Sequence, residues 1–220
     1  MRRVFIHGAG RSGQDAWPLS DGTNADFVSF APGSTISEQV ATLIAAYSAT
    51  RVLLHAHSLG AVPAVLAAAS DRVDVAGLVL VEPALYDIAR GEAPIERHIA
   101  TVTEARAQAE IGDLQGFWAI FRPLMFDAPF DADRWDAERT AAQRWATSNV
   151  PWGHGVRVHM MAGIPTLVVT GGWNDEYEII ARELTRNGAR HVVLDGAAHR
   201  PQDLPGFLPA ARAFTLSLTS

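Results

Sequence analysis

Short β-branched apolar runs alternate with helical patterns along most of the chain, and this alternation constrains the fold more than any other feature. The runs predict six strands, at residues 3–7, 25–30, 51–55, 75–81, 166–170 and 191–194. They are apolar almost throughout, as parallel strands covered on both faces are. The sequence therefore predicts an α/β fold, with a mostly parallel six-stranded sheet and helices on both faces.

Helical patterns lie between these runs. Residues 34–47 carry apolar side chains at helical spacing, and Thr35 with Glu38 has the form of a capping box. A second helix is expected after Ser58, and a third at about 175–187, where Gly188 ends it. Pro209 is expected in the first turn of a last helix.

The stretch from 85 to 161 differs from the rest because it holds helical patterns only, at 94–111, 113–126 and 131–147. We therefore expect one domain, 1–220, with a helical lid inserted at about 85–161. The stretch is also rich in aromatic residues. Those expected to contact a substrate, or to pack the lid onto the sheet, are Phe117, Trp118, Phe121, Trp145 and Trp152.

The composition excludes several kinds of chemistry. The 220 residues include no cysteine, so the chain has no disulfide, thiolate nucleophile or cysteine-ligated metal. All 18 basic residues are arginines, so a Schiff-base lysine, a Walker lysine and a kinase lysine are excluded as well.

The net charge of −6, with no run of basic residues, argues against nucleic acid or an anionic membrane as a partner. No apolar stretch approaches the roughly 20 residues of a membrane span, and no secretory signal is visible. We expect a cytoplasmic protein whose partner is a small-molecule substrate; the sequence does not indicate an oligomeric state.

The strongest local motif is Ser58, which stands between an apolar strand and a helix with Gly60 two positions later. A nucleophile elbow needs this strand–turn–helix context, because the sharp turn presents the serine hydroxyl at the carboxyl end of the sheet. Ala56 stands where the motif has its first glycine. The simpler interpretation is a serine that caps a helix.

Three further motifs follow strands of the same sheet. His7-Gly8-Ala9-Gly10 is a tight turn that can direct a backbone N–H at an oxyanion, and Leu59 can supply a second N–H. Asp175 follows Gly171-Gly172, and His199 follows the last strand. A serine needs a base, and the base needs a carboxylate that fixes its tautomer, so Ser58, Asp175 and His199 are candidates for a catalytic triad.

With these motifs, the chain resembles the α/β-hydrolase superfamily over nearly its whole length. The resemblance implies Ser58 as nucleophile, His199 as base, Asp175 as acid, and the amides of Ala9 and Leu59 as oxyanion hole. The family's leading antiparallel hairpin is not expected here. The family's acid can also follow the preceding strand, where this chain has Glu82, so Glu82 is the alternative acid.

The expected activity is hydrolysis of a small, mostly apolar carboxylic ester through an acyl-enzyme, with no cofactor and no metal. The alternatives are carbon–carbon bond hydrolysis, cofactor-free peroxidation or lyase chemistry on the same triad, or a non-catalytic ligand-binding protein. His55 and His57 have a spacing that is sometimes seen in metal sites, but no third ligand is evident.

Overall fold

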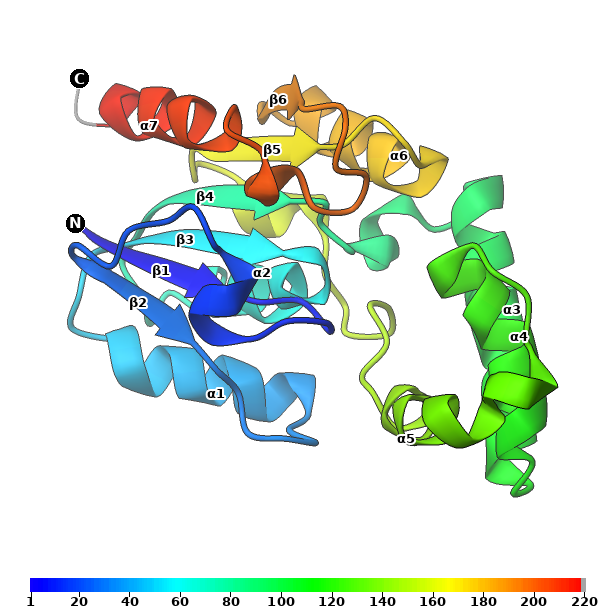
Figure 1. Cartoon of the computed structure of the whole chain (residues 1–220). Coiled ribbons are helices and arrows are strands. Elements are labelled where there is room, and N and C mark those ends of the chain that lie inside the picture. Colours follow the sequence, from blue (N-terminus) through cyan, green and yellow to red (C-terminus); the bar gives the residue numbers. More distant parts are fainter. Residues whose placement is uncertain (219–220) are drawn as a thin grey trace. The chain divides into compact units, whose positions relative to one another are not determined.

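The computed structural model describes residues 1–218, and its described strands form one parallel sheet (Figure 1). The strands are β1 (Arg2–Ile6), β2 (Ala25–Val28), β3 (Val52–His57), β4 (Val75–Val81), β5 (Thr166–Thr170) and β6 (Arg190–Val193). They lie in the order β2-β1-β3-β4-β5-β6, and every neighbouring pair is parallel. The α/β fold class predicted from the alternating pattern is confirmed.

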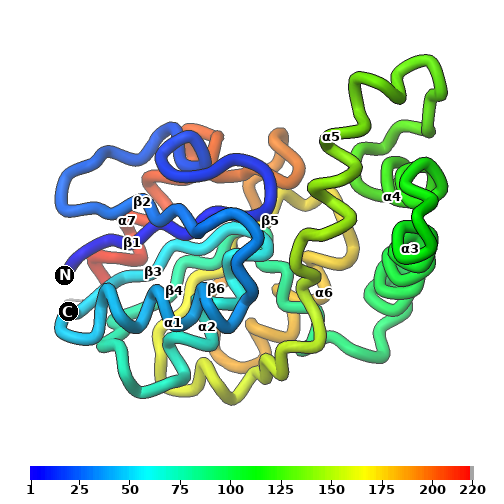
Figure 2. The backbone as a smooth tube through the Cα atoms, turned by 90° about the horizontal axis from the view of Figure 1, so that it is seen from below, coloured from blue at the N-terminus to red at the C-terminus, as the bar shows by residue number. Residues whose placement is uncertain are grey.

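Helices cover both faces of this sheet. On one face α1 (Ile36–Tyr47) packs against α2 (Ala61–Ala68), and on the other lies α7 (Phe207–Ser217), as Figures 1 and 2 show. Helix α6 (Asp175–Arg186) contacts β5 and β6. The capping box is confirmed, because the Thr35 side chain accepts from the Glu38 N–H and the Glu38 carboxylate accepts from the Thr35 N–H.

The chain divides into two compact units, of which the larger joins residues Met1–Ala89 to Val150–Ser220 and carries the sheet. The smaller, Arg90–Asn149, is the inserted unit. It holds α3 (Ala93–Glu110), α4 (Leu114–Phe126) and α5 (Trp135–Ala146), in which α4 contacts both other helices. The insertion expected at about 85–161 is therefore wider than this unit, because its first and last residues belong to the larger unit.

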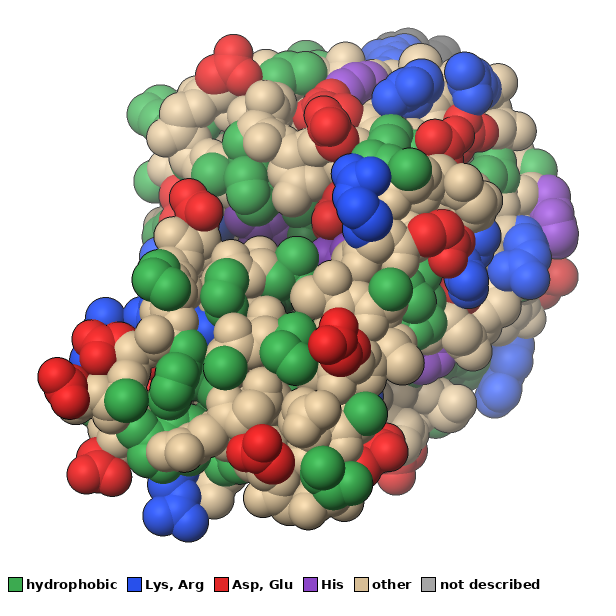
Figure 3. Space-filling view, turned by 90° about the vertical axis from the view of Figure 1, so that its right-hand side faces the viewer, with side chains coloured by type: hydrophobic (Ala, Val, Ile, Leu, Met, Phe, Trp, Pro, Cys, Tyr) green, Lys and Arg blue, Asp and Glu red, His purple; other side chains and the backbone are tan. Residues whose placement is uncertain are grey.

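One face of the molecule mixes side chains of different kinds. Figure 3 shows acidic, basic and apolar side chains interspersed over the face that it draws. Among the described residues, no helix combines the length and the apolar character that crossing a bilayer requires.

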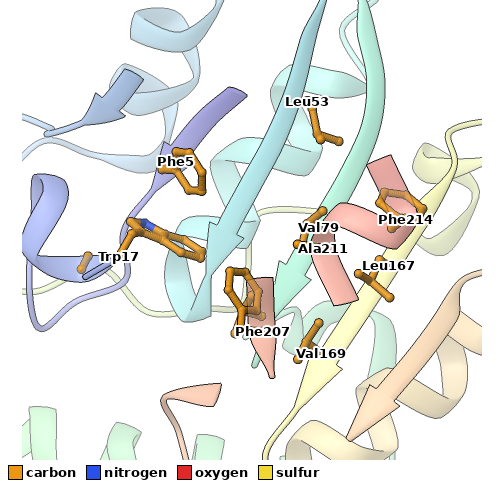
Figure 4. Close-up of a cluster of buried hydrophobic side chains, with 11 residues drawn as sticks. Phe5, Trp17, Leu53, Val79, Leu167, Val169, Phe207, Ala211 and Phe214 are labelled. Carbon is orange, nitrogen blue, oxygen red and sulfur yellow. The ribbon is translucent and has the colours of Figure 1, made fainter. Parts of the chain in front are cut away.

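The apolar core between the sheet and α7 gives the carboxyl ends of the strands a rigid support (Figure 4). Each fully buried Val, Leu or Phe side chain of this core contributes about 1.5–3 kcal/mol relative to its exposed state. The cluster consists of Phe5, Ala16, Trp17, Leu53, Val79, Val81, Leu167, Val169, Phe207, Ala211 and Phe214.

Gly60 lies where the turn after β3 passes the end of β1. A Cβ atom at this position would stand 2.3 Å from the carbonyl oxygen of His7 and 3.0 Å from the Ile6 side chain. Backbone atoms cannot move aside as easily as the tip of a flexible side chain can. Glycine at position 60 therefore allows the two strand ends to approach each other.

Gly60→Ala should lower the free energy of unfolding by about 1–3 kcal/mol, the usual cost of forcing extra atoms into a packed site. The matched control is Gly22→Ala, where a Cβ would meet no atom within 4 Å. The control should leave stability unchanged or raise it by about 0.4–1 kcal/mol. Urea unfolding of both variants measures the difference, and equal stabilities would contradict the close approach.

Candidate active site

Ser58 occupies a sharp turn at the carboxyl end of β3. It begins a single 3-10 turn, Ser58–Gly60, that leads directly into α2. Its φ of 52° is in the left-handed region, which a non-glycine residue adopts only at an energetic cost. Such a turn presents the serine side chain at the edge of the sheet, as the nucleophile elbow predicted from the sequence requires.

The loop after β1 lies against this turn. A Cβ atom on Gly8 would stand 2.9 Å from Ser58 Cβ and 3.1 Å from the carbonyl oxygen of His57. His7 contacts the same loop, because its Nδ1 lies 2.6 Å from the carbonyl oxygen of Gly8. Ala9 follows Gly8 in this loop, and Leu59 follows Ser58 in the turn.

His199 meets a carboxylate, and that carboxylate is Glu82. The distance from His199 Nδ1 to Glu82 Oε2 is 3.2 Å. The Glu82 side chain is completely buried, whereas one third of the His199 side chain is exposed. Glu82 follows the end of β4 with a φ of 44°, so a left-handed residue marks this strand end as well.

Two more hydrogen bonds hold the Glu82 carboxylate. The backbone N–H of Gly171 donates to Oε1 at 2.6 Å, and the Trp173 indole N–H donates to Oε2 at 3.0 Å. A buried carboxylate needs such donors to offset the loss of its hydration. The residues that follow β5 therefore serve to fix the carboxylate that follows β4.

Asp175, the carboxylate that the sequence favoured, lies elsewhere. It is exposed in the first turn of α6, where a negative charge interacts favourably with the helix dipole. The cap of this helix is Asn174, whose side-chain oxygen accepts from the N–H of Glu176 at 2.7 Å. The carboxylate that contacts His199 is therefore that of Glu82, the alternative acid, and not that of Asp175.

The two glycines before Asp175 allow a close approach between loops. A Cβ atom on Gly171 would stand 2.0 Å from the carbonyl oxygen of Ala198. Gly172 has a φ of 68°, and a Cβ there would stand 2.5 Å from the Asp195 carboxylate. The glycine pair lets the His199 loop approach β5, which brings His199 within reach of Glu82.

His57 directly precedes Ser58, and its side chain contacts the main-chain carbonyl of His199. Its Nε2 lies 2.8 Å from the carbonyl oxygen of His199, and the two ring centroids are 4.8 Å apart. Burial lowers the pKa of His57 well below its usual value, so the ring is neutral. Because a carbonyl oxygen only accepts, Nε2 carries the proton and donates it to this bond.

Tyr177, which the sequence analysis did not single out, contacts both His199 and Ser58. Its ring centroid is 4.9 Å from that of His199, and its hydroxyl interacts with the side chains of Ser58 and Tyr86. Burial raises the pKa of Tyr177, so the phenol keeps its proton. The sequence feature that could have identified Tyr177 is its position in the first turn of the helix that follows Trp173, because this turn begins beside the edge of the sheet.

Asp87 fastens the segment that contains Trp152. Its carboxylate accepts the backbone N–H groups of Gly153 and Gly155 at 2.8 Å, and also those of His154 and Val156. The Trp152 ring stacks on Tyr86, with centroids 6.0 Å apart. Trp152, expected to bind substrate, is therefore held next to a tyrosine that interacts with Tyr177.

The other aromatic residues expected to bind substrate lie in the inserted unit. There they pack on one another, with Phe121 5.0 Å from Phe117 and 5.3 Å from Trp145 between ring centroids. The Trp118 indole N–H donates to Glu138 at 2.6 Å. The structure accounts for their packing, and their part in substrate binding stays a prediction.

His55 and His57 share one face of β3, where the edge of Trp17 contacts both rings. His55 is 3% exposed and stacks on Phe5. Within residues 1–218, no group of three or more histidine, aspartate or glutamate side chains could hold a metal ion. His55 is thus a packing residue, whereas His57 packs on Trp17 and also holds the His199 carbonyl.

The buried His55 should make stability depend on pH. Burial lowers its pKa from 6.5 to about 3, so below pH 6.5 the unfolded chain gains a proton that the folded chain does not bind. His55→Gln should reduce the loss of stability between pH 6.5 and 5 by up to about 1.4 kcal/mol per pH unit. Urea unfolding across this range measures the slope.

The matched control for this slope is His159→Gln, since His159 is exposed. It should keep the wild-type dependence on pH. A wild-type slope in His55→Gln would mean that His55 is protonated in the folded protein.

Comparisons with known proteins identify the family and the fold. The alpha/beta hydrolase family matches residues 4–210, whereas curated proteins give no match. MenH from S. aureus is 14% identical, with a TM-score of 0.69 over 100% of this chain and 95% of that one. A carboxylesterase of the ammonia-oxidizing thaumarchaeon Nitrososphaera gargenis is 16% identical, with a TM-score of 0.62 over 99% and 90%.

A mutant of the haloalkane dehalogenase DatA from Agrobacterium tumefaciens is 19% identical, with a TM-score of 0.61 over 100% of this chain and 90% of that one. At these identities the three structures share the fold, while the names carboxylesterase and haloalkane dehalogenase indicate different reactions. The family match spans nearly the whole sequence, and the chain belongs to the alpha/beta hydrolase family.

Proposed function

We propose that this protein is a serine hydrolase that cleaves a small, mostly apolar carboxylic ester, with Ser58, His199 and Glu82 as its triad. The observation that carries the proposal is the contact between His199 Nδ1 and the buried Glu82 carboxylate, next to the left-handed turn at Ser58. In this arrangement Nδ1–H faces the acid, which leaves Nε2 free to act as the base.

The reaction follows from these positions. Ser58 Oγ attacks the ester carbonyl while His199 Nε2 takes the serine proton. The oxyanion is stabilised by the amides of Ala9 and Leu59, which the approach of Gly8 to Ser58 supports as an oxyanion hole. His199 returns the proton to the leaving alcohol, and a water molecule then hydrolyses the acyl-enzyme.

Aromatic side chains near the triad support an apolar substrate. Trp173, half-exposed, lies 6.2 Å from His199 between ring centroids, and Trp152 stacks on Tyr86. The mixed surface charges of Figure 3 favour a small molecule over nucleic acid as the partner. Serine at position 58 argues against dehalogenation, which needs a carboxylate nucleophile there.

The same triad could also serve carbon–carbon bond hydrolysis, cofactor-free peroxidation or lyase chemistry, or the site could bind a ligand without reacting. Labelling with a fluorophosphonate tests for a reactive serine, and a series of nitrophenyl esters of increasing acyl length then tests for ester hydrolysis. Labelling without turnover of any ester would favour the other triad reactions. Absence of both would contradict the proposal.

Ser58→Ala should abolish fluorophosphonate labelling and lower ester turnover by about 10⁴–10⁶-fold, because it removes the covalent nucleophile. Its thermal unfolding should resemble that of the wild type. The matched control is Ser37→Ala on the exposed side of α1, which should keep full labelling and turnover. Turnover by Ser58→Ala at a wild-type rate would exclude this mechanism.

Glu82→Gln should lower kcat by about 10³–10⁴-fold, the scale on which control of the histidine tautomer is lost. Asp175→Asn, the matched change at the carboxylate favoured from the sequence, should lower kcat by at most about tenfold, because Asp175 is an exposed residue of α6. Steady-state kinetics on one nitrophenyl ester compare them. The opposite order would assign the acid to Asp175.

A further inference from the structure

A series of hydroxyl groups leads from Ser58 to a carboxylate, and the proposed triad does not use it. The Tyr177 hydroxyl interacts with the side chains of both Ser58 and Tyr86. The Tyr86 hydroxyl in turn donates to a carboxylate oxygen of Glu176. Tyr177 and Tyr86 are both buried, at 8% and 1% exposure, which restricts how their hydroxyl groups can turn.

The donors and acceptors in this series of hydrogen bonds can be assigned. The Tyr86 hydrogen lies on the Glu176 carboxylate, so the Tyr86 oxygen faces Tyr177 as an acceptor. The Tyr177 hydrogen is then directed at Tyr86, and the lone pairs of the Tyr177 oxygen face Ser58. Tyr177 thus offers a hydrogen-bond acceptor on the reacting side of the serine, and its ring lies against His199.

We propose that Tyr177 positions the water molecule that hydrolyses the acyl-enzyme, by accepting one of its hydrogens while His199 Nε2 accepts the other. Tyr177 interacts with the Ser58 side chain, which would carry the acyl group, and the His199 ring lies against Tyr177. Tyr177 is then a catalytic residue of the second half-reaction. The inference rests on the proposed function, since it needs an acyl group on Ser58.

The step balances with the groups present. The water oxygen forms a bond to the acyl carbon, and the bond from that carbon to Ser58 Oγ breaks. The water hydrogen on His199 passes through Nε2 to Ser58 Oγ, which restores the serine hydroxyl. The hydrogen on Tyr177 stays with the acid product, so Tyr177 neither gains nor loses a proton.

An alcohol that competes with water for the acyl-enzyme distinguishes this role of Tyr177 from a purely structural one. Methanol also attacks an acyl-enzyme, but it has one O–H hydrogen, which His199 must accept. Loss of the Tyr177 hydroxyl should therefore impair hydrolysis more than methanolysis. The partition between the two products is decided after the acyl-enzyme has formed, so it does not depend on how fast Ser58 is acylated.

The experiment uses the full chain with p-nitrophenyl acetate and graded methanol, and measures the ratio of methyl acetate to acetate. Tyr177→Phe removes the hydroxyl but keeps the ring against His199. The ratio should rise about three- to tenfold, which corresponds to one neutral hydrogen bond. The matched control is Tyr47→Phe at the end of α1, where the tyrosine interacts with Asp26, and its ratio should stay at the wild-type value.

A second variant, Tyr177→Met, also lacks the hydroxyl and should shift the ratio in the same direction. An unchanged ratio in both variants would overturn the inference and leave the proposed function intact, whether or not total turnover falls. A wild-type protein that neither forms an acyl-enzyme nor releases nitrophenol through Ser58 would overturn the proposed function, and the inference with it.

Discussion

The candidate site depends on one buried carboxylate, that of Glu82. It accepts hydrogen bonds from the Gly171 amide and the Trp173 indole, and it contacts the His199 imidazole. A carboxylate without such partners would cost several kcal/mol to bury. The end of β4 and the loops after β5 and β6 are therefore held at one point, and the position of His199 follows from it.

Close backbone contacts make this convergence possible. Gly8, Gly60 and Gly171 lie where a side chain would collide with a neighbouring loop. Three non-glycine residues at the same edge, Ser58, Glu82 and Ala198, adopt left-handed conformations that the packed sheet must stabilise. Left-handed backbone thus occurs at the candidate nucleophile, at its carboxylate and at the residue before His199.

The sequence predicted the strands, the helices and the turn at Ser58 well, because period, capping and glycine spacing are local signals. The choice between Glu82 and Asp175 is not local. Both residues follow adjacent strands, so alternation alone places either beside His199. What decides is the left-handed backbone at Glu82 and the approach of Ala198 to Gly171, which join segments far apart in the sequence. Tyr177 was missed because its contacts with Ser58 and His199 likewise join segments far apart in the sequence.

His199 has two separate restraints, and they act on different parts of the residue. His57 holds its carbonyl oxygen, which fixes the loop, while Glu82 holds Nδ1, which fixes the ring and its tautomer. The loop therefore has an anchor that does not involve the carboxylate. Because of this separation, the kinetic defect of a Glu82 variant reports on the charge and tautomer of His199, and a defect of a His57 variant reports on its position.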